Sequence, residues 1–173
     1  MPLTLLLGGA RSGKSRLAVQ LAEAQQAPVV YLATGEPRDE EMQARIELHR
    51  AERPGGWETV EEPLELAPAI RGAAADACVV VDCLSLWVSN ALEQRPAEEV
   101  EALGAAAAEA AASRAGLTIA VSNEVGLGIV PMHPVGRAYR DLLGRVNVLW
   151  SEAADDAYFV IAGRALPLER LGG

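Results

Sequence analysis

The chain has 173 residues, which suits one domain with a sizeable core, and its formal net charge at pH 7 is −9. This acidic balance argues against broad binding to nucleic acid or to an anionic membrane surface, and no apolar run approaches the roughly 18 residues of a membrane span. Cys78 and Cys83 are too few for a disulfide scaffold or a zinc site, and the apolar start of the chain is too short for a secretory leader. We therefore expect a cytoplasmic protein that inserts into no membrane and binds no nucleic acid.

A glycine-rich segment follows the first apolar run, residues 3–7, and precedes a helical pattern at 15–25. Its residues are Gly8-Gly9-Ala10-Arg11-Ser12-Gly13-Lys14-Ser15, which fit G-x-x-x-x-G-K-S. Glycines let backbone N–H groups approach phosphate oxygens, and a helix N-terminus adds partial positive charge there. We expect Lys14, the only lysine among 15 basic residues, to reach the β- and γ-phosphates of a nucleotide and Ser15 to hold Mg²⁺.

Apolar runs alternate with helical patterns along the rest of the chain. Strands are expected at 29–33, 57–60, 77–81, 117–121 and 157–162. Helices are expected at 39–53, 64–74, 84–92, 96–114 and 133–155, with 96–114 as a solvated, alanine-rich scaffold helix. The sequence pattern gives only a weak indication of the secondary structure of the tail from residue 163. The alternation predicts a single α/β domain over residues 1–173, with a largely parallel central sheet flanked by helices.

Polar residues follow the expected strands at the edge where such sheets bind ligands. Asp82 ends the run at 77–81, a position where an acid commonly holds Mg²⁺ or a metal-bound water, although it could instead cap the next helix. Glu124 lies in a glycine-flanked loop after the run at 117–121. Metal binding, polarisation of a nucleophile and capping of the loop all remain open for Glu124.

The helix at 39–53 carries His49 on one face with Met42 and Ile46, and Asp39 is its expected N-cap. A neutral imidazole can attack phosphorus and form a covalent phosphoramidate. Three arginines whose forks suit phosphate oxygens lie within one turn of the histidine: Arg45, Arg50 and Arg53. The alternatives are a packed or surface histidine and a salt-bridged helix face, because acidic side chains alternate with these arginines.

Five segments together form a specific combination: 8–15 (GGARSGKS), 31–34 (YLAT), 44–50 (ARIELHR) with Arg53-Pro54 and Trp57, 123–131 (NEVGLGIVP) and 144–147 (GRVN). They resemble the bifunctional adenosylcobinamide kinase / adenosylcobinamide-phosphate guanylyltransferase family of cobalamin biosynthesis over about residues 3–163. One departure is Asp82, where the family carries Glu. The resemblance implies a P-loop, RecA-like fold and a homotrimer.

The resemblance also implies two reactions. ATP or GTP phosphorylates adenosylcobinamide; GTP then transfers GMP to His49, pyrophosphate leaves, and adenosylcobinamide-phosphate takes the GMP to give adenosylcobinamide-GDP. Catalytic residues implied are His49 and Lys14, and Ser15 and Asp82 would hold Mg²⁺. The implied nucleotide contacts are Gly8 to Ser15, Thr34, Gly35, Glu36, Arg50, Ala51, Glu52, Arg53, Glu61 and Asp82.

Two other functions fit the residues themselves. One is a P-loop small-molecule kinase in which His49 is structural. The other is a nucleotide-gated binding or assembly protein that transfers no group. A guanine-reading G-protein is excluded, because its Asn/Thr-Lys-x-Asp loop needs a second lysine and the chain has none.

Overall fold

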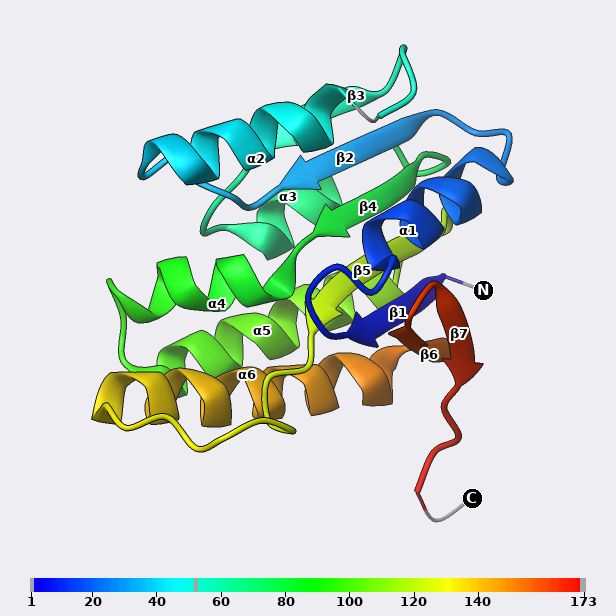
Figure 1. Cartoon of the computed structure of the whole chain (residues 1–173). Helices are drawn as coiled ribbons and strands as arrows, with labels where there is room; N and C mark the ends of the chain where they lie inside the picture. Colours follow the sequence, from blue (N-terminus) through cyan, green and yellow to red (C-terminus); the bar gives the residue numbers. More distant parts are fainter. Residues whose placement is uncertain (1, 52, 172–173) are drawn as a thin grey trace.

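A seven-stranded sheet forms the centre of the structure, in the order β3-β2-β4-β5-β1-β6-β7 (Figure 1). The computed structural model describes residues 2–51 and 53–171. Its strands are β1 (Leu3–Gly8), β2 (Val29–Ala33), β3 (Glu58–Glu61), β4 (Cys78–Asp82), β5 (Thr118–Asn123), β6 (Asp156–Ile161) and β7 (Arg164–Pro167). Its helices are α1 (Lys14–Glu23), α2 (Glu40–Ala51), α3 (Leu66–Gly72), α4 (Leu84–Leu92), α5 (Ala97–Ala112) and α6 (Pro134–Ala153).

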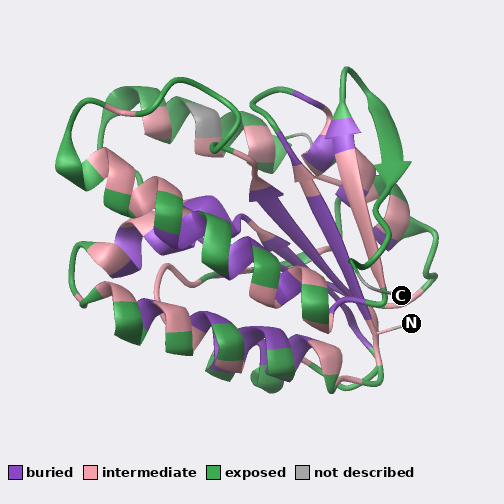
Figure 2. Ribbon diagram, turned by 90° about the horizontal axis from the view of Figure 1, so that it is seen from below, coloured by how far each residue is buried: buried purple, intermediate pink, exposed green. Residues whose placement is uncertain are grey.

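Strands β1 to β6 pair in parallel, and only β7 is antiparallel, which confirms the expected α/β fold with a largely parallel sheet. Successive side chains of a strand point to opposite faces, so each inner strand contributes to two cores. Leu3 and Leu5 of β1 pack toward α3, α4, α5 and α6, whereas Leu6 packs toward α1. Figure 2 shows the inner strands buried between these helical layers.

Helix α5 corrects one expectation, because it is not a solvated scaffold helix. It packs against α3 and α6, and a seam of small residues along it is buried, including Gly104, Ala107 and Ala111. The side chains of Trp87 and Val146 lie 3.6 and 3.3 Å from the position that a Cβ on Gly104 would take. The small residue at Gly104 therefore lets α4 and α6 approach α5 closely. In the described residues, no helix combines the length and apolar character needed to cross a bilayer.

The expected helices and strands are present, with boundaries shifted by a few residues, and Asp39 caps α2 through a 2.7 Å hydrogen bond from the Met42 amide to Oδ1. Strand β7 is the element that the sequence pattern missed. It joins β6 through Ala162 and Gly163, both in left-handed conformation, with φ of 49° and 73°. Alanine rarely takes that conformation and β7 is exposed along its length, so neither turn chemistry nor apolar alternation marks this hairpin.

Replacing Gly8 by alanine should destabilise the fold. A Cβ there would lie 2.2 Å from the carbonyl oxygen of Val160 and 3.0 Å from Oγ of Ser12, and the φ of Gly8 is +156°. Because β6 backbone would have to move, we expect a loss of about 1–3 kcal/mol in the free energy of unfolding, measured by denaturant titration. Gly9→Ala is the control, because no atom lies within 4 Å of its added Cβ. Equal midpoints for the two variants would contradict the expected clash.

Candidate functional site

A cavity of about 520 Å³ opens at the carboxyl edge of the sheet, where β1, β2, β4 and β5 end beside the start of α1. Its wall is formed by the glycine-rich loop, the strand ends and one face of α2. The lining residues are Ala10, Arg11, Ser12, Gly13, Lys14, Ser15, Arg16, Tyr31, Ala33, Gly35, Met42, Ile46, Leu48, His49, Arg50, Arg53, Glu61, Asp82, Cys83, Leu86, Val121 and Asn123. The glycine-rich loop and the histidine helix, more than 30 residues apart in sequence, therefore face one space.

Lys14 is held across the glycine-rich loop. Its Nζ donates to the carbonyl oxygen of Gly9 at 2.7 Å and lies 3.4 Å from Oγ of Ser12. Gly13 and Arg11 take left-handed conformations, which turn the chain into α1. Burial lowers the pKa of Lys14, although Cys83 and Asp82 act in the opposite direction. A desolvated ammonium in this position interacts strongly with an incoming anion, because little water screens it.

The carboxylate of Asp82 is oriented by Tyr31, whose hydroxyl donates to Oδ2. Burial, and then the neighbouring Asp82, raises the pKa of Tyr31, so the phenol stays a hydrogen-bond donor. The guanidinium carbon of Arg53 lies 3.6 Å from the centre of the Tyr31 ring, a cation–π geometry. Tyr31 is a site residue that the sequence analysis did not assign, because its pairing with Asp82 depends on β2 lying beside β4.

Helix α2 presents Met42, Ile46 and His49 to the cavity, the same three residues that the helical spacing placed on one face. Arg50 forms an ion pair with Glu61 at the end of β3, and Nη1 of Arg53 lies 3.3 Å from Oγ1 of Thr59. These contacts tie the end of α2 to the edge of the sheet. The expected contact residue Glu52 lies outside the described residues.

Several expected contact residues lie away from the cavity surface. Thr34 is fully buried; its Oγ1 accepts from the Cys83 amide at 2.8 Å and donates to the Cys83 carbonyl at 2.7 Å. Glu36 is paired with Arg38 at 2.7 Å, and Ala51 is exposed elsewhere on α2. Gly8 is buried beneath the loop, and Gly9 offers its carbonyl to Lys14. Thr34 therefore joins the ends of β2 and β4 under the site.

Glu124 and the two cysteines have structural surroundings. Oε1 of Glu124 accepts from the Gly126 amide, which is the loop-capping alternative. Burial, followed by the neighbouring Asp82, raises the pKa of Cys83 to about 11, so its thiol stays protonated near neutral pH. Cys83 and Cys78 are buried and form no disulfide.

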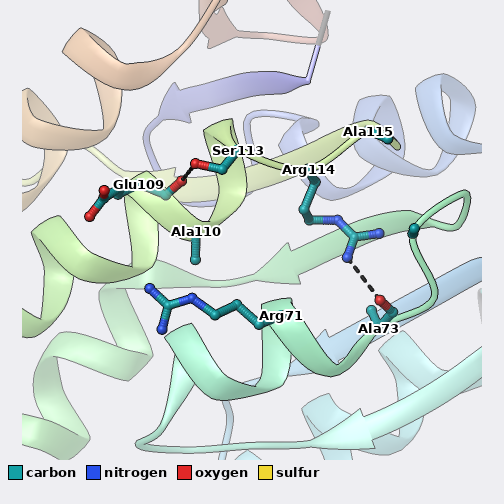
Figure 3. Close-up of a pocket in the computed structure, with 8 residues that line it drawn as sticks. Arg71, Ala73, Glu109, Ala110, Ser113, Arg114 and Ala115 are labelled. Carbon is teal, nitrogen blue, oxygen red and sulfur yellow. Dashed lines mark hydrogen bonds between the residues drawn. The ribbon is translucent and has the colours of Figure 1, made fainter.

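A second cavity, of about 420 Å³, lies between α3 and α5 on the far side of the sheet from α1 (Figure 3). Figure 3 shows Arg114 turned toward the chain that follows α3. Its guanidinium donates to the carbonyl oxygens of Ile70, Ala73, Ala74 and Ala77 at 2.8–3.1 Å. Arg114 therefore satisfies carbonyl groups at the end of α3 and in the segment between α3 and β4, and its role in this cavity is structural.

Solved structures of similar fold include an ATPase and a helicase. An ATPase from the type III secretion system of pathogenic bacteria matches with a TM-score of 0.51 and 12% identity, over 96% of this chain and 56% of that one. A DnaB-like replicative helicase matches with a TM-score of 0.50 over 91% of this chain and 46% of that one. A Pyrococcus horikoshii OT3 protein studied as PH0250 has a TM-score of 0.59 at 8% identity, covering 98% of this chain and 87% of that one. At such identities the likeness shows the fold alone, a single α/β domain with a mostly parallel sheet flanked by helices.

Sequence comparison gives the family. The bifunctional adenosylcobalamin biosynthesis protein CobP of Pseudomonas aeruginosa is 43% identical over 95% of this chain and 96% of its own length. The bifunctional proteins named CobU from Escherichia coli and Salmonella typhimurium are each 36% identical over 93% of this chain and 96% of theirs. The model of the family described as cobinamide kinase / cobinamide phosphate guanyltransferase matches residues 4–168. The chain therefore belongs to this family of bifunctional enzymes.

Proposed function

We propose that one cavity serves both reactions of this enzyme, the phosphorylation of adenosylcobinamide and the transfer of GMP to the product. The observation that carries the proposal is that the phosphate loop and His49 line the same cavity. A triphosphate held by the loop would share this cavity with both groups that act on it: Lys14 at the γ-phosphate and His49 at the α-phosphorus. A kinase without a covalent intermediate would use the same loop but would give His49 no chemical task.

For phosphoryl transfer from ATP or GTP, we assign the triphosphate to the loop from Gly8 to Ser15, with the ammonium of Lys14 on the β- and γ-phosphates. Ser15 and Asp82 both line the cavity, which makes them the candidate Mg²⁺ ligands. In the described part of the chain, no group of three or more His, Cys, Asp or Glu side chains could hold a metal. This sparse donor set fits Mg²⁺, which is usually held by one or two protein oxygens together with phosphates and water. When bound, Mg²⁺ supplies neutralisation of the phosphate charge.

For guanylyl transfer, an imidazole nitrogen of His49 attacks the α-phosphorus of GTP. The bond from that phosphorus to the bridging oxygen breaks, and pyrophosphate leaves. A phosphate oxygen of adenosylcobinamide-phosphate then attacks the same phosphorus, which releases His49 and gives adenosylcobinamide-GDP. Arg50 and Arg53 hold the end of α2 at the sheet edge, and this position supports a role in placing the histidine.

An intact-mass measurement tests this proposal. After incubation with GTP and removal of free nucleotide, we expect the protein to gain the mass of one GMP residue, and a second assay should show phosphorylation of cobinamide. Phosphorylation without a covalent GMP would favour the simple kinase. A protein that binds GTP but does neither would favour the nucleotide-gated binding protein.

We also propose a homotrimer, from the family resemblance. Multi-angle light scattering should give a mass near that of three chains. A mass of one or two chains would contradict this assembly.

Asp82→Asn should slow both reactions by about 10²-fold and raise the Mg²⁺ concentration needed for half-maximal rate, because one charged oxygen ligand is lost. The measurement is a Mg²⁺ titration of cobinamide phosphorylation and of GMP incorporation. Tyr31→Phe is the control: it removes the hydroxyl that orients Asp82 but leaves the carboxylate, so a smaller loss is expected. Wild-type rates for Asp82→Asn at limiting Mg²⁺ would show that Asp82 is only structural.

A further inference from the structure

The carboxyl end of β5 combines an oriented amide with an exposed apolar loop, and neither feature is used by the nucleotide as placed above. From them we infer that this end of β5 is the binding site for the alcohol acceptor of the kinase reaction. Asn123 accepts a hydrogen bond from the acceptor hydroxyl, and the apolar body of the acceptor lies against residues 125–132. The inference rests on the kinase activity proposed above.

Asn123 stands between the two catalytic elements of the kinase site. Strand β5 lies between β1 and β4, and in this sheet Asn123 pairs with Gly8 of β1 while Val121 pairs with Asp82 of β4. The side chain of Asn123 lines the cavity. A group at this position is therefore beside both the phosphate loop and the candidate metal ligand, where the acceptor oxygen has to arrive.

One buried partner orients the side-chain amide of Asn123, and a second holds its backbone. Nδ2 of Asn123 donates to Oγ of Ser85 at 2.9 Å, which orients the side chain, and the backbone carbonyl of Asn123 accepts from Nδ2 of Asn147 at 3.1 Å, which holds the main chain. Both partners are at least 94% buried and are themselves held: Oγ of Ser85 lies 3.0 Å from Sγ of Cys83, and Oδ1 of Asn147 lies 2.6 Å from Oγ of Ser122. This leaves Oδ1 of Asn123 as the acceptor of its carboxamide.

An oriented acceptor oxygen is what phosphoryl transfer to an alcohol requires, since catalysis of this step is mostly positioning. The acceptor oxygen bonds to the γ-phosphorus as the bond from that phosphorus to the β–γ bridging oxygen breaks. The nucleoside diphosphate leaves and the hydroxyl proton is released to solvent. A hydrogen bond from the hydroxyl to Oδ1 would direct a lone pair of the alcohol toward the γ-phosphorus.

The loop that follows Asn123 is apolar, exposed and anchored. No charged residue occurs from 125 to 132. Its exposed apolar side chains are Val125, Leu127, Ile129, Val130 and Met132, at 37, 81, 97, 56 and 91%. The Glu124 amide donates to the Gly8 carbonyl at 3.1 Å, and Nη1 of Arg137 donates to the carbonyls of Pro131 and Met132 at 3.0 and 2.7 Å. Five exposed apolar side chains within eight successive residues mark a candidate site of interaction.

The size and position of the cavity favour the acceptor as the molecule that binds against this loop. About 520 Å³ suits one nucleotide, so a corrin macrocycle has to lie largely outside it. In Figure 1 the loop between β5 and α6 begins beside the phosphate loop. When the hydroxyl of the acceptor is bound at Asn123, its corrin ring would therefore lie over residues 125–132. The hydrocarbon parts of a corrin ring can pack against this surface. The competing occupant is a second copy of this chain.

The loop is tested with a matched pair of double variants. Leu127→Ser/Val130→Ser should raise the KM for cobinamide by about tenfold or more, because two apolar contacts are lost, and should leave the KM for GTP and the labelling of His49 unchanged. The control is Leu166→Ser/Val148→Ser, which removes the same side-chain types from other surfaces; Leu166 and Val148 are 56 and 55% exposed. We expect the control to leave all three measurements unchanged.

The amide is tested separately. Asn123→Ala should lower the kinase kcat about 10²-fold while the labelling of His49 by GTP, which needs no acceptor, stays within about twofold and reports that the protein is folded. Ser85→Ala should give a smaller fall in kcat, since it removes only the group that orients Asn123.

Three outcomes would overturn the inference: an unchanged KM for cobinamide in the loop variant, an equal loss of phosphorylation and labelling in Asn123→Ala, or a loop variant that changes only the mass seen by light scattering. The last would make the loop a contact between copies. If the wild-type enzyme phosphorylates cobinamide but the variants give any of these three outcomes, the acceptor site is wrong while the proposed function stands. If the wild type does not phosphorylate cobinamide, the proposed function fails with it.

Discussion

Replacing Lys14 by alanine should abolish both reactions and weaken GTP binding. Its Nζ is buried at the cavity wall, tethered to the Gly9 carbonyl, where an approaching triphosphate would exchange that contact for its own oxygens. Loss of a charge contact of this kind to the transition state commonly costs about 10²–10³ in rate. Calorimetric titration with GTP, cobinamide phosphorylation and incorporation of GMP measure the three effects.

Arg16→Ala is the matched control for this experiment. Arg16 lines the same cavity two residues later and is exposed, so its removal also deletes one positive charge from the site. We expect a loss of only a few fold, because an exposed charge is screened by water. Thermal melting of both variants checks that the loop still folds. Unchanged GTP binding and turnover in Lys14→Ala would remove the assignment of the phosphate loop.

Wild-type protein should become covalently labelled by GTP that carries its label on the α-phosphate, and not by GTP labelled only on the γ-phosphate. His49→Ala should lose this label and the guanylyl transfer altogether. It should keep kinase activity, because phosphoryl transfer to an alcohol needs position and Mg²⁺ rather than a covalent histidine. The measurement is labelled protein separated from free nucleotide, followed by assay of each reaction.

The chemistry of the bond gives further tests of the histidine. A phosphoramidate should be lost in acid and survive base, unlike a serine ester, and added pyrophosphate should reverse the labelling. The chain has two histidines, and His133 lies exposed before α6, so His133→Ala is the control and should label fully. Retention of the α-label by His49→Ala, or its absence from wild type, would make the simple kinase the better assignment.

The sequence by itself determined the features that depend on residues close together along the chain. The glycine-rich loop between a strand and a helix is one such feature, and it folds from eight successive residues. The helical period alone placed Met42, Ile46 and His49 on one face, and side-chain chemistry identified Asp39 as the cap of α2. The alternation of apolar runs with helical patterns gave the parallel α/β sheet, because both periods are local properties.

Only the tertiary structure decided which of these local features meet. The order of the strands puts Tyr31 beside Asp82 and puts Asn123 between the phosphate loop and Asp82. It also buries Thr34, which the family resemblance had made an expected nucleotide contact. These arrangements join residues that lie tens of positions apart, and no local period or turn residue encodes such a distance. A different reason hid β7: its pairing with β6 is local, but it rests on a turn with alanine in a left-handed conformation, which turn residues do not mark.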